Sequence, residues 1–369
     1  MVIKCLGFGG AERLVVDTLA ARDRDRFDYE VAYVLDAENA LVPVVESGGT
    51  PVHSLGGHGN RDLRWMPRLR RLVIDGGYDV VHFHLPYTAA LGRLVVASVP
   101  AGRRPVIVYT EHSPWNRMAL LIRGLNRAAI GLDRSLIVVS QAGHDALPRR
   151  LRGRSRVIVH GIDLARTRDL VARRDTIRGR IRHELGVADD QALVLAVANF
   201  RPEKAYDVLL EATRVMADRT LPVTVAAVGR GPLADELEAH HRRLDLGGRF
   251  LFLGPRDDVL ELMIGADVFV LPSRQEGLPV VLMEATSVGI PIVATAVGAV
   301  PLVLTDEVDG LVVPSEDATA LADALERVIA DPDLRARLGR GALERSSYFD
   351  VAAATRQIET IYRGVTGAG

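Results

Sequence analysis

Residues 267–298 read DVFVLPSRQEGLPVVLMEATSVGIPIVATAVG, and this stretch decides the fold. The apolar run 267–271 ends in a proline and a serine, as a buried parallel strand does. Pro279 opens a second apolar run at helical spacing, where proline is tolerated because the first helical turn needs no N–H there. Gly289 closes this predicted helix, and residues 290–294 form the next buried strand. The stretch therefore predicts a strand–helix–strand unit of a parallel α/β sheet.

The loop 273–278 is the candidate ligand site, because it follows the carboxyl end of a strand and leads into a helix N-terminus. The backbone amides of Gly277 and Leu278, together with the positive end of the helix dipole, suit a phosphate. Two carboxylates, Glu276 and Glu284, flank this cradle. Phosphate repels carboxylates, so we expect them to accept hydrogen bonds from hydroxyl groups beside the phosphates. Phosphates flanked by polyhydroxyl groups describe a nucleotide sugar.

Length and composition indicate a two-domain protein of the ordinary globular class. At 369 residues the chain exceeds one typical core, while 48% hydrophobic and 25% charged residues are usual values. No apolar run is long enough to span a bilayer, and the N-terminus lacks a secretory apolar region. The single cysteine, Cys5, excludes an internal disulfide and is typical of a reducing cytoplasm.

The net charge of −1 conceals an asymmetry between the two halves of the chain. Residues 1–185 carry 29 basic and 19 acidic groups, or +10, while residues 186–369 carry 17 and 28, or −11. This is either chance segregation or a first half that meets an anionic surface or substrate. The segments 61–74 and 117–132 combine arginines with apolar stripes, as helices on anionic membranes do, although core-packing helices show the same pattern. Arginine abundance alone is no evidence for nucleic-acid binding, and we expect none.

The first half alternates strands and helices. Gly9 and Gly10 form a glycine turn before a helical pattern, which lets the backbone approach a ligand. Strands are predicted at 29–35, 52–55, 79–84, 105–110, 135–140 and 156–159. His82 and His84 point to the same side of one strand, and with His112 they form a candidate zinc set. The alternative is that these strand-end histidines only make structural hydrogen bonds, and we expect no metal.

The second half repeats this alternation. Strands are predicted at 192–198, 222–228, 250–253, 267–271, 290–294 and 311–313. The fold class is therefore α/β, with two Rossmann-like parallel-sheet domains facing across a cleft. We assign residues 1–172 to the first domain, 173–190 to a linker with one helix, and 191–349 to the second domain. An amphipathic helix is expected at about 350–369, and the family resemblance described below implies that it packs back on the first domain.

Lys204 is one of only two lysines and stands just before a helix in ANFRPEKAYDVLLEA (198–212). There it can meet a diphosphate as a point charge.

Several segments resemble one enzyme family. EGLPVVLME at 276–284 resembles the E-x7-E motif of the retaining glycosyltransferases of family 4, which have the GT-B fold. GGAER at 9–13, YTEH at 109–112 and FLGPRDDV at 252–259 resemble further segments of these enzymes. Three departures stand out: His160 replaces the usual asparagine in HGID, Asn199 occupies a position where arginine is commonest, and Ala205 replaces a glycine.

The resemblance implies transfer of a sugar from a nucleotide diphosphate sugar to an acceptor hydroxyl, with the anomeric configuration kept. It implies catalytic roles for His112 and Glu276 at the sugar and for Lys204 and Arg201 at the leaving diphosphate. The remaining donor-binding residues would be Gly9, Gly10, Asn199, Arg256, Gly277, Leu278, Pro279 and Glu284. It implies no cofactor besides the donor.

The acceptor expected from this resemblance is a glycan or a lipid-linked molecule. The expected location is the cytoplasm, with peripheral binding at the inner face of the membrane as an option. Two alternatives remain open: a GT-B sugar-nucleotide epimerase, and a non-catalytic member of the family that acts as a binding protein.

Overall fold

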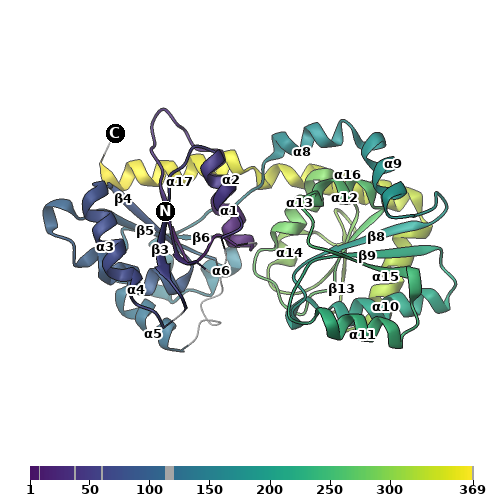
Figure 1. Ribbon diagram of the computed structural model, residues 1–369. Helices are drawn as coiled ribbons and strands as arrows, with labels where there is room; N and C mark the ends of the chain where they lie inside the picture. Colours follow the sequence, from purple (N-terminus) through teal and green to yellow (C-terminus); the bar gives the residue numbers. More distant parts are fainter. Residues whose placement is uncertain (8, 37–38, 60, 113–119, 368–369) are drawn as a thin grey trace. The chain divides into compact units, whose positions relative to one another are not determined.

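The computed structural model describes residues 1–7, 9–36, 39–59, 61–112 and 120–367 (Figure 1). The chain divides into two compact units, each with its own parallel sheet. Unit 1 comprises Met1–Ile162 together with Asp350–Gly369, and unit 2 comprises Asp163–Phe349. The predicted α/β class with two Rossmann-like sheets is confirmed.

Unit 1 contains a seven-stranded sheet in the order β3-β2-β1-β4-β5-β6-β7, with every pair parallel. Its strands are β1 Val2–Ile3, β2 Val31–Leu35, β3 Val52–Gly57, β4 Val80–His84, β5 Val106–Glu111, β6 Ser135–Val138 and β7 Ser155–Val157. Its described helices are α1 Gly10–Ala20, α2 Val42–Ser47, α3 Trp65–Gly76, α4 Pro86–Ala97, α5 Leu120–Ala129, α6 Gln141–Asp145, α7 Arg149–Arg152 and α17 Val351–Thr366, with 3₁₀ turns at Ala101–Arg103 and Ile130–Leu132.

Helices cover both faces of this sheet, because side chains alternate along each strand. Val2 packs with the buried residues of α3 and α4, while its neighbour Ile3 packs with those of α1 and α17. The C-terminal helix α17 contacts α1 within unit 1, as the yellow ribbon of Figure 1 shows.

Unit 2 contains a six-stranded parallel sheet in the order β10-β9-β8-β11-β12-β13. Its strands are β8 Ala192–Val197, β9 Val223–Val228, β10 Phe250–Gly254, β11 Val268–Leu271, β12 Ile292–Thr295 and β13 Leu311–Val313. Its helices are α8 Leu164–Val171, α9 Arg174–Glu184, α10 Tyr206–Asp218, α11 Ala234–Arg243, α12 Val259–Gly265, α13 Val280–Val288, α14 Val300–Val303, α15 Ala318–Ala330 and α16 Pro332–Ser346. Short 3₁₀ turns lie at Pro202–Lys204, Gly247–Arg249 and Ser347–Phe349.

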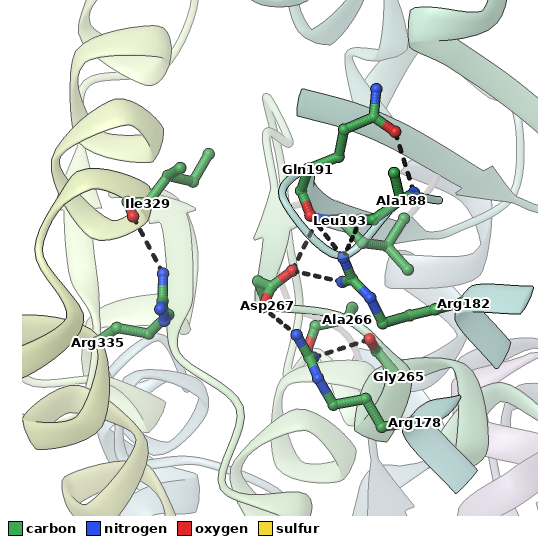
Figure 2. A network of polar contacts seen from close by, with 10 residues as sticks. All are labelled: Arg178, Arg182, Ala188, Gln191, Leu193, Gly265, Ala266, Asp267, Ile329 and Arg335. Carbon is green, nitrogen blue, oxygen red and sulfur yellow. Dashed lines mark hydrogen bonds and ion pairs between the residues drawn. The ribbon is translucent and has the colours of Figure 1, made fainter. Parts of the chain in front are cut away.

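The segment predicted as a linker is an integral part of unit 2. Arg178 and Arg182 of α9 both bind the carboxylate of Asp267, at 2.7 Å and 3.0 Å, and the backbone N–H of Leu193 donates to the same carboxylate (Figure 2). Asp267 directly precedes β11 and Leu193 lies in β8. These contacts dock α9 on the amino edge of the sheet, so the boundary with unit 1 falls at Ile162 instead of residue 172.

The two arginine-rich helices of unit 1 differ in what they do with their apolar residues. In α3, Trp65, Leu69 and Val73 are buried in the core, as in an ordinary packing helix. In α5, Leu120 and Leu121 are 76% and 74% exposed. Arg117, also part of the predicted helix 117–132, lies outside the described residues.

Candidate active site

The sheet order places two loops of unit 2 together. β8 and β11 are neighbours, but the chain continues from β8 to β9 on one side and from β11 to β12 on the other. This reversal is a topological switch point, where open α/β sheets bind ligands at the carboxyl ends of their strands. The loop after β8 carries Lys204, and the loop after β11 carries Glu276.

Lys204 and Glu276 form the charged centre of this switch point. The Lys204 Nζ donates to both carboxylate oxygens of Glu276, at 2.7 Å and 2.9 Å. The Ser273 hydroxyl donates to Glu276 Oε1 at 2.6 Å. The Glu276 side chain is 5% exposed and that of Lys204 is 23% exposed. A buried carboxylate is thus held by two donors, one of which still faces solvent.

Arg274 ties the two loops together beside this pair. Its guanidinium donates to both oxygens of Asp207 in the first turn of α10, at 2.8 Å and 2.6 Å, and to the Pro202 carbonyl at 2.9 Å. It also reaches Glu316 at 2.6 Å, and its backbone N–H donates to the Glu203 carbonyl. The neighbouring guanidinium lowers the pKa of Asp207. Bidentate pairing of this kind fixes geometry as well as charge.

The loop after β12 supports Glu276 from the other side. Gly298 has φ +58°, and a Cβ there would lie 2.0 Å from the Glu276 carbonyl oxygen, so no side chain fits. The Thr295 hydroxyl donates to the Ser273 carbonyl at 2.5 Å, and the Ala299 N–H donates to the Gly277 carbonyl.

The predicted phosphate cradle lies at the start of α13. Gly289 ends this helix in the left-handed conformation, as the sequence predicted, whereas Pro279 is its extended N-cap, one position before the first helical turn where the sequence placed it. Gly277 and Leu278 precede the helix, and within the described part of the chain neither amide donates a hydrogen bond to protein. Glu284 lies half-buried in the second turn.

The other predicted donor residues of unit 2 have different surroundings. Asn199 and Arg201 lie exposed in the loop after β8, and among the described residues the Arg201 guanidinium has no ion-pair partner. Ala205, where the family has glycine, has φ +52° and ends the turn that carries Lys204. Arg256 does not join Lys204: its guanidinium binds Asp258 at 2.7 Å and Glu184 at 2.7 Å.

At the carboxyl edge of unit 1, four histidine rings form a stack. His82 and His84 lie on β4, His112 directly follows β5, and His160 follows β7. The ring centroids are 4.2 Å apart for His82–His84 and 5.5 Å for His112–His160. His84 Nδ1 and His112 Nε2 share a hydrogen bond of 3.0 Å. Burial lowers the pKa of all four, that of His160 to about 4, so the stack is uncharged at neutral pH.

This geometry does not favour the zinc set. His82 Nδ1 is bound to the Tyr362 hydroxyl at 2.5 Å and its Nε2 to the Thr110 hydroxyl at 2.7 Å, so both ring nitrogens are already engaged. Across the described ranges, no three His, Cys, Asp or Glu side chains gather as a metal site would require.

Gly9 and Gly10 lie at the start of α1, after β1, at the switch point between β1 and β4.

Sequence reasoning missed the residues that hold Glu276 and His112 in place. Ser273 follows a strand end and stands three positions before Glu276, which was the available signal. Arg274 and Asp207 act through contacts between loops that are distant in sequence, so no local pattern announces them. His84 was singled out as a strand-end histidine, but its hydrogen bond with His112 was not predicted.

Solved structures of other proteins superpose on this chain over nearly its whole length. The solved structure of Anabaena HepE in complex with UDP superposes with a TM-score of 0.81 over 98% of both chains at 23% identity. The structure of the lipopolysaccharide glycosyltransferase WaaG superposes with a TM-score of 0.70 at 18% identity, over 99% of this chain and 100% of that one. The architecture is therefore that of the GT-B glycosyltransferases.

Sequence comparison gives the family. The model for "Glycosyltransferase Family 4" matches residues 8–166, and the model for "Glycosyl transferases group 1" matches residues 177–345. A D-inositol 3-phosphate glycosyltransferase of Saccharomonospora viridis is 34% identical over 79% of this chain and 72% of its own length. A phosphatidyl-myo-inositol mannosyltransferase of Mycolicibacterium smegmatis is 30% identical over 89% and 83%. The chain belongs to glycosyltransferase family 4 and is an enzyme that transfers a sugar from a nucleotide sugar.

Proposed function

We propose that this enzyme transfers a hexose, with retention of configuration and without a metal ion, to a hydroxyl group of a phosphate-bearing acceptor. The observation that carries this proposal is the Lys204–Glu276 pair at the switch point of unit 2. Breaking the bond between sugar and diphosphate leaves positive charge on the sugar and negative charge on the departing phosphate. A lysine, an exposed arginine and the amides at the start of α13 suit that departing charge.

Five of the predicted residues have a role in this proposed reaction. Lys204 and Arg201 bind the diphosphate, while Glu276 accepts hydrogen bonds from the sugar hydroxyls and so exchanges its lysine partner for the substrate. Glu284 accepts from the ribose. His112 of unit 1 contacts the transferred sugar. Because its pKa is lowered by burial, His112 offers a neutral donor and acceptor instead of a positive charge.

The acceptor class follows from charge and from relatives. The +10 of residues 1–185 favours an anionic molecule, and the two relatives named above act on phosphorylated inositols by their names. A third relative, from Escherichia coli, is named as a galactosyltransferase acting on a diphosphoundecaprenol-linked sugar, at 28% identity over 73% of this chain and 71% of its own length.

A thermal-shift screen tests the donor. UDP-glucose, UDP-galactose, UDP-N-acetylglucosamine and GDP-mannose are compared, since a ligand at 100 times its Kd stabilises the fold by about 2.7 kcal/mol. The stabilising donor is then incubated with D-inositol 3-phosphate, phosphatidylinositol vesicles or an undecaprenyl diphosphate sugar. The proposal is supported if NMR shows that the transferred sugar keeps the anomeric configuration of the donor and if EDTA does not lower the transfer rate. Donor conversion without acceptor supports an epimerase, and binding without turnover supports a non-catalytic protein.

We further propose reversible binding of α5 to an anionic membrane. Leu120 and Leu121 are exposed, with Arg123 and Arg127 on the same helix. Among the described helices none is long and apolar enough to cross a bilayer. Sedimentation with anionic vesicles should recover the protein at low salt and release it at high salt, because each basic residue contributes about 1 kcal/mol and salt screens it. Leu121→Ser with unchanged sedimentation would contradict this role of α5.

A further inference from the structure

The histidine stack of unit 1 contains buried polar atoms that no described residue satisfies. His160 is 1% exposed, and neither Nδ1 nor Nε2 has a hydrogen-bond partner among the described residues. His84 is also 1% exposed, and its Nε2 has no hydrogen-bond partner among the described residues. Buried polar groups without partners cost free energy and are uncommon in folded proteins. His160 therefore offers a donor and an acceptor that a bound hydrogen-bonding group can meet.

The position of His160 in the fold connects this deficit to the substrate. It follows β7 at the carboxyl edge of the sheet, where α/β units bind ligands. Its ring lies nearly parallel to that of His112, with an interplanar angle of 22° and a centroid distance of 5.5 Å. The two rings therefore lie in the same environment. A ligand that contacts His112 also lies close to His160.

His160 also stands where the family pattern has asparagine. An asparagine amide and a neutral imidazole have one feature in common, since each presents a hydrogen-bond donor and an acceptor on the same side chain. A metal ion is a weaker explanation, because no cluster of three ligating side chains forms among the described residues and His82 is fully engaged elsewhere.

The chemistry of the stack selects the ligand class. A neutral ring with one N–H and one bare nitrogen matches a hydroxyl group, which both accepts and donates. It does not match a phosphate, which offers acceptors only and is better met by cations.

We propose that His160 forms a hydroxyl-binding subsite on unit 1, which recognises a sugar or polyol hydroxyl of a bound substrate and replaces the asparagine of the family. This inference rests on the proposed function, because the subsite lies beside His112. The hydroxyl belongs either to the transferred sugar or to the acceptor, and the two sources give different kinetics.

His160→Phe and His160→Asn separate the nitrogens from the ring. Phenylalanine keeps a flat ring beside His112 but removes both nitrogens, whereas asparagine restores a donor and an acceptor. We measure kcat and both KM values with the donor from the thermal-shift screen and D-inositol 3-phosphate as the acceptor. His183→Phe, at an exposed position on α9, is the matched control. The Kd for UDP and the circular dichroism spectrum check that each variant is folded.

The phenylalanine variant should raise one KM about 3- to 10-fold, the effect of one neutral hydrogen bond, and the asparagine variant should restore it to within about 2-fold. A change in the acceptor KM assigns the subsite to the acceptor, and a change in the donor KM or kcat assigns it to the transferred sugar. If both variants match the wild type, His160 holds only a structural water and the proposal is overturned.

Failure of the proposed function is distinguishable from failure of this subsite. If the wild-type enzyme transfers no sugar, ligand-observed NMR with myo-inositol and with glucose compares the wild type with the phenylalanine variant directly. Loss of the polyol signal in the variant alone supports the subsite. Equal signals, or none in the wild type, overturn it. If His160→Phe does not fold, His160→Ala takes its place in both experiments.

Discussion

The two units use the same architecture to build two different electrostatic environments, one charged and one uncharged. Each has a parallel sheet with a switch point, and each places its candidate residues at the carboxyl ends of the strands. In unit 2 these residues are charged, with Lys204 held against Glu276. In unit 1 they are the four stacked histidines, whose pKa values burial lowers.

This difference shows how two units with the same architecture can serve two different tasks. A diphosphate that gains negative charge needs fixed cations and amide dipoles, and a lysine beside a helix N-terminus supplies both kinds of partner. Hydroxyl groups need donors and acceptors without a net charge, and buried imidazoles supply both. The sheet only determines where side chains gather, while the residues at the strand ends determine the chemistry.

The largest expected effect comes from removing the carboxylate of the charged centre. Glu276→Ala should lower kcat by roughly 10²- to 10³-fold, as the loss of one group acting on the transition state does. The affinity for free UDP should not fall, because Lys204 loses its competitor and stays available for phosphate. Single-turnover rates and calorimetric UDP binding measure the two quantities, with Glu238→Ala on α11 as the surface control. A parallel loss of turnover and UDP affinity would contradict the assignment of Glu276 to the sugar.

Acid should destabilise unit 1 before unit 2. A histidine whose folded pKa is lowered stabilises the fold fully above its unfolded value of about 6.5, and this stabilisation is lost as the pH falls toward the folded pKa. Each such histidine contributes a slope of about 1.4 kcal/mol per pH unit. Asp133 and Glu359 in the same unit have raised pKa values and act in the opposite direction, but the four histidines outnumber them.

Tryptophan fluorescence can follow unit 1, because Trp65 is buried in its core and the only other tryptophan of the sequence, Trp115, also falls within residues 1–162. The urea midpoint by fluorescence should decrease between pH 7 and pH 5 more steeply than the midpoint by far-ultraviolet circular dichroism, which reports both units. His160→Asn should flatten the fluorescence trend. A fluorescence midpoint that is independent of pH would show that the stack is not held neutral.

Lys204→Ala is expected to have the next largest effect. The loss of a charge-assisted hydrogen bond should weaken the donor and free UDP alike, by about 1.5–3 kcal/mol. The variant also leaves Glu276 without its cation, and this carboxylate then repels the phosphates. Calorimetry with UDP and with the intact donor provides the measurement, and Arg201→Ala in parallel shows whether the exposed arginine shares the role. If UDP affinity is unchanged in the lysine variant, the diphosphate does not bind at this switch point.

Most of the fold could be predicted from the sequence, because buried parallel strands are continuous apolar runs that end in turn residues. Each predicted strand is present, with small shifts at its ends. The end of unit 1 was misplaced, since the attachment of α9 depends on Arg178 and Arg182 meeting Asp267, a contact across about 85 positions of sequence. The pairing of Lys204 with Glu276 was not foreseen either, for the same reason: switch-point neighbours come from different loops.

The smallest effect concerns the turn that holds Lys204. Ala205 has φ +52° where the family has glycine, and a left-handed non-glycine residue costs about 1–2 kcal/mol. Ala205→Gly removes that strain, but it also removes a buried methyl group worth about 0.8 kcal/mol and adds about 0.4–1 kcal/mol of unfolded-state entropy, so we expect stability to change by less than about 1 kcal/mol. Thr220→Gly, at φ +60° after α10, is the matched control away from Lys204. Thermal unfolding by circular dichroism measures both variants, and UDP affinity should stay unchanged in both because the turn keeps its conformation.

The turnover of Ala205→Gly then decides what the departure from the family pattern means. Turnover equal to the wild type shows that alanine is tolerated in a working enzyme. A large increase would show that the strained turn misplaces Lys204, and would move this chain toward the binding-protein alternative.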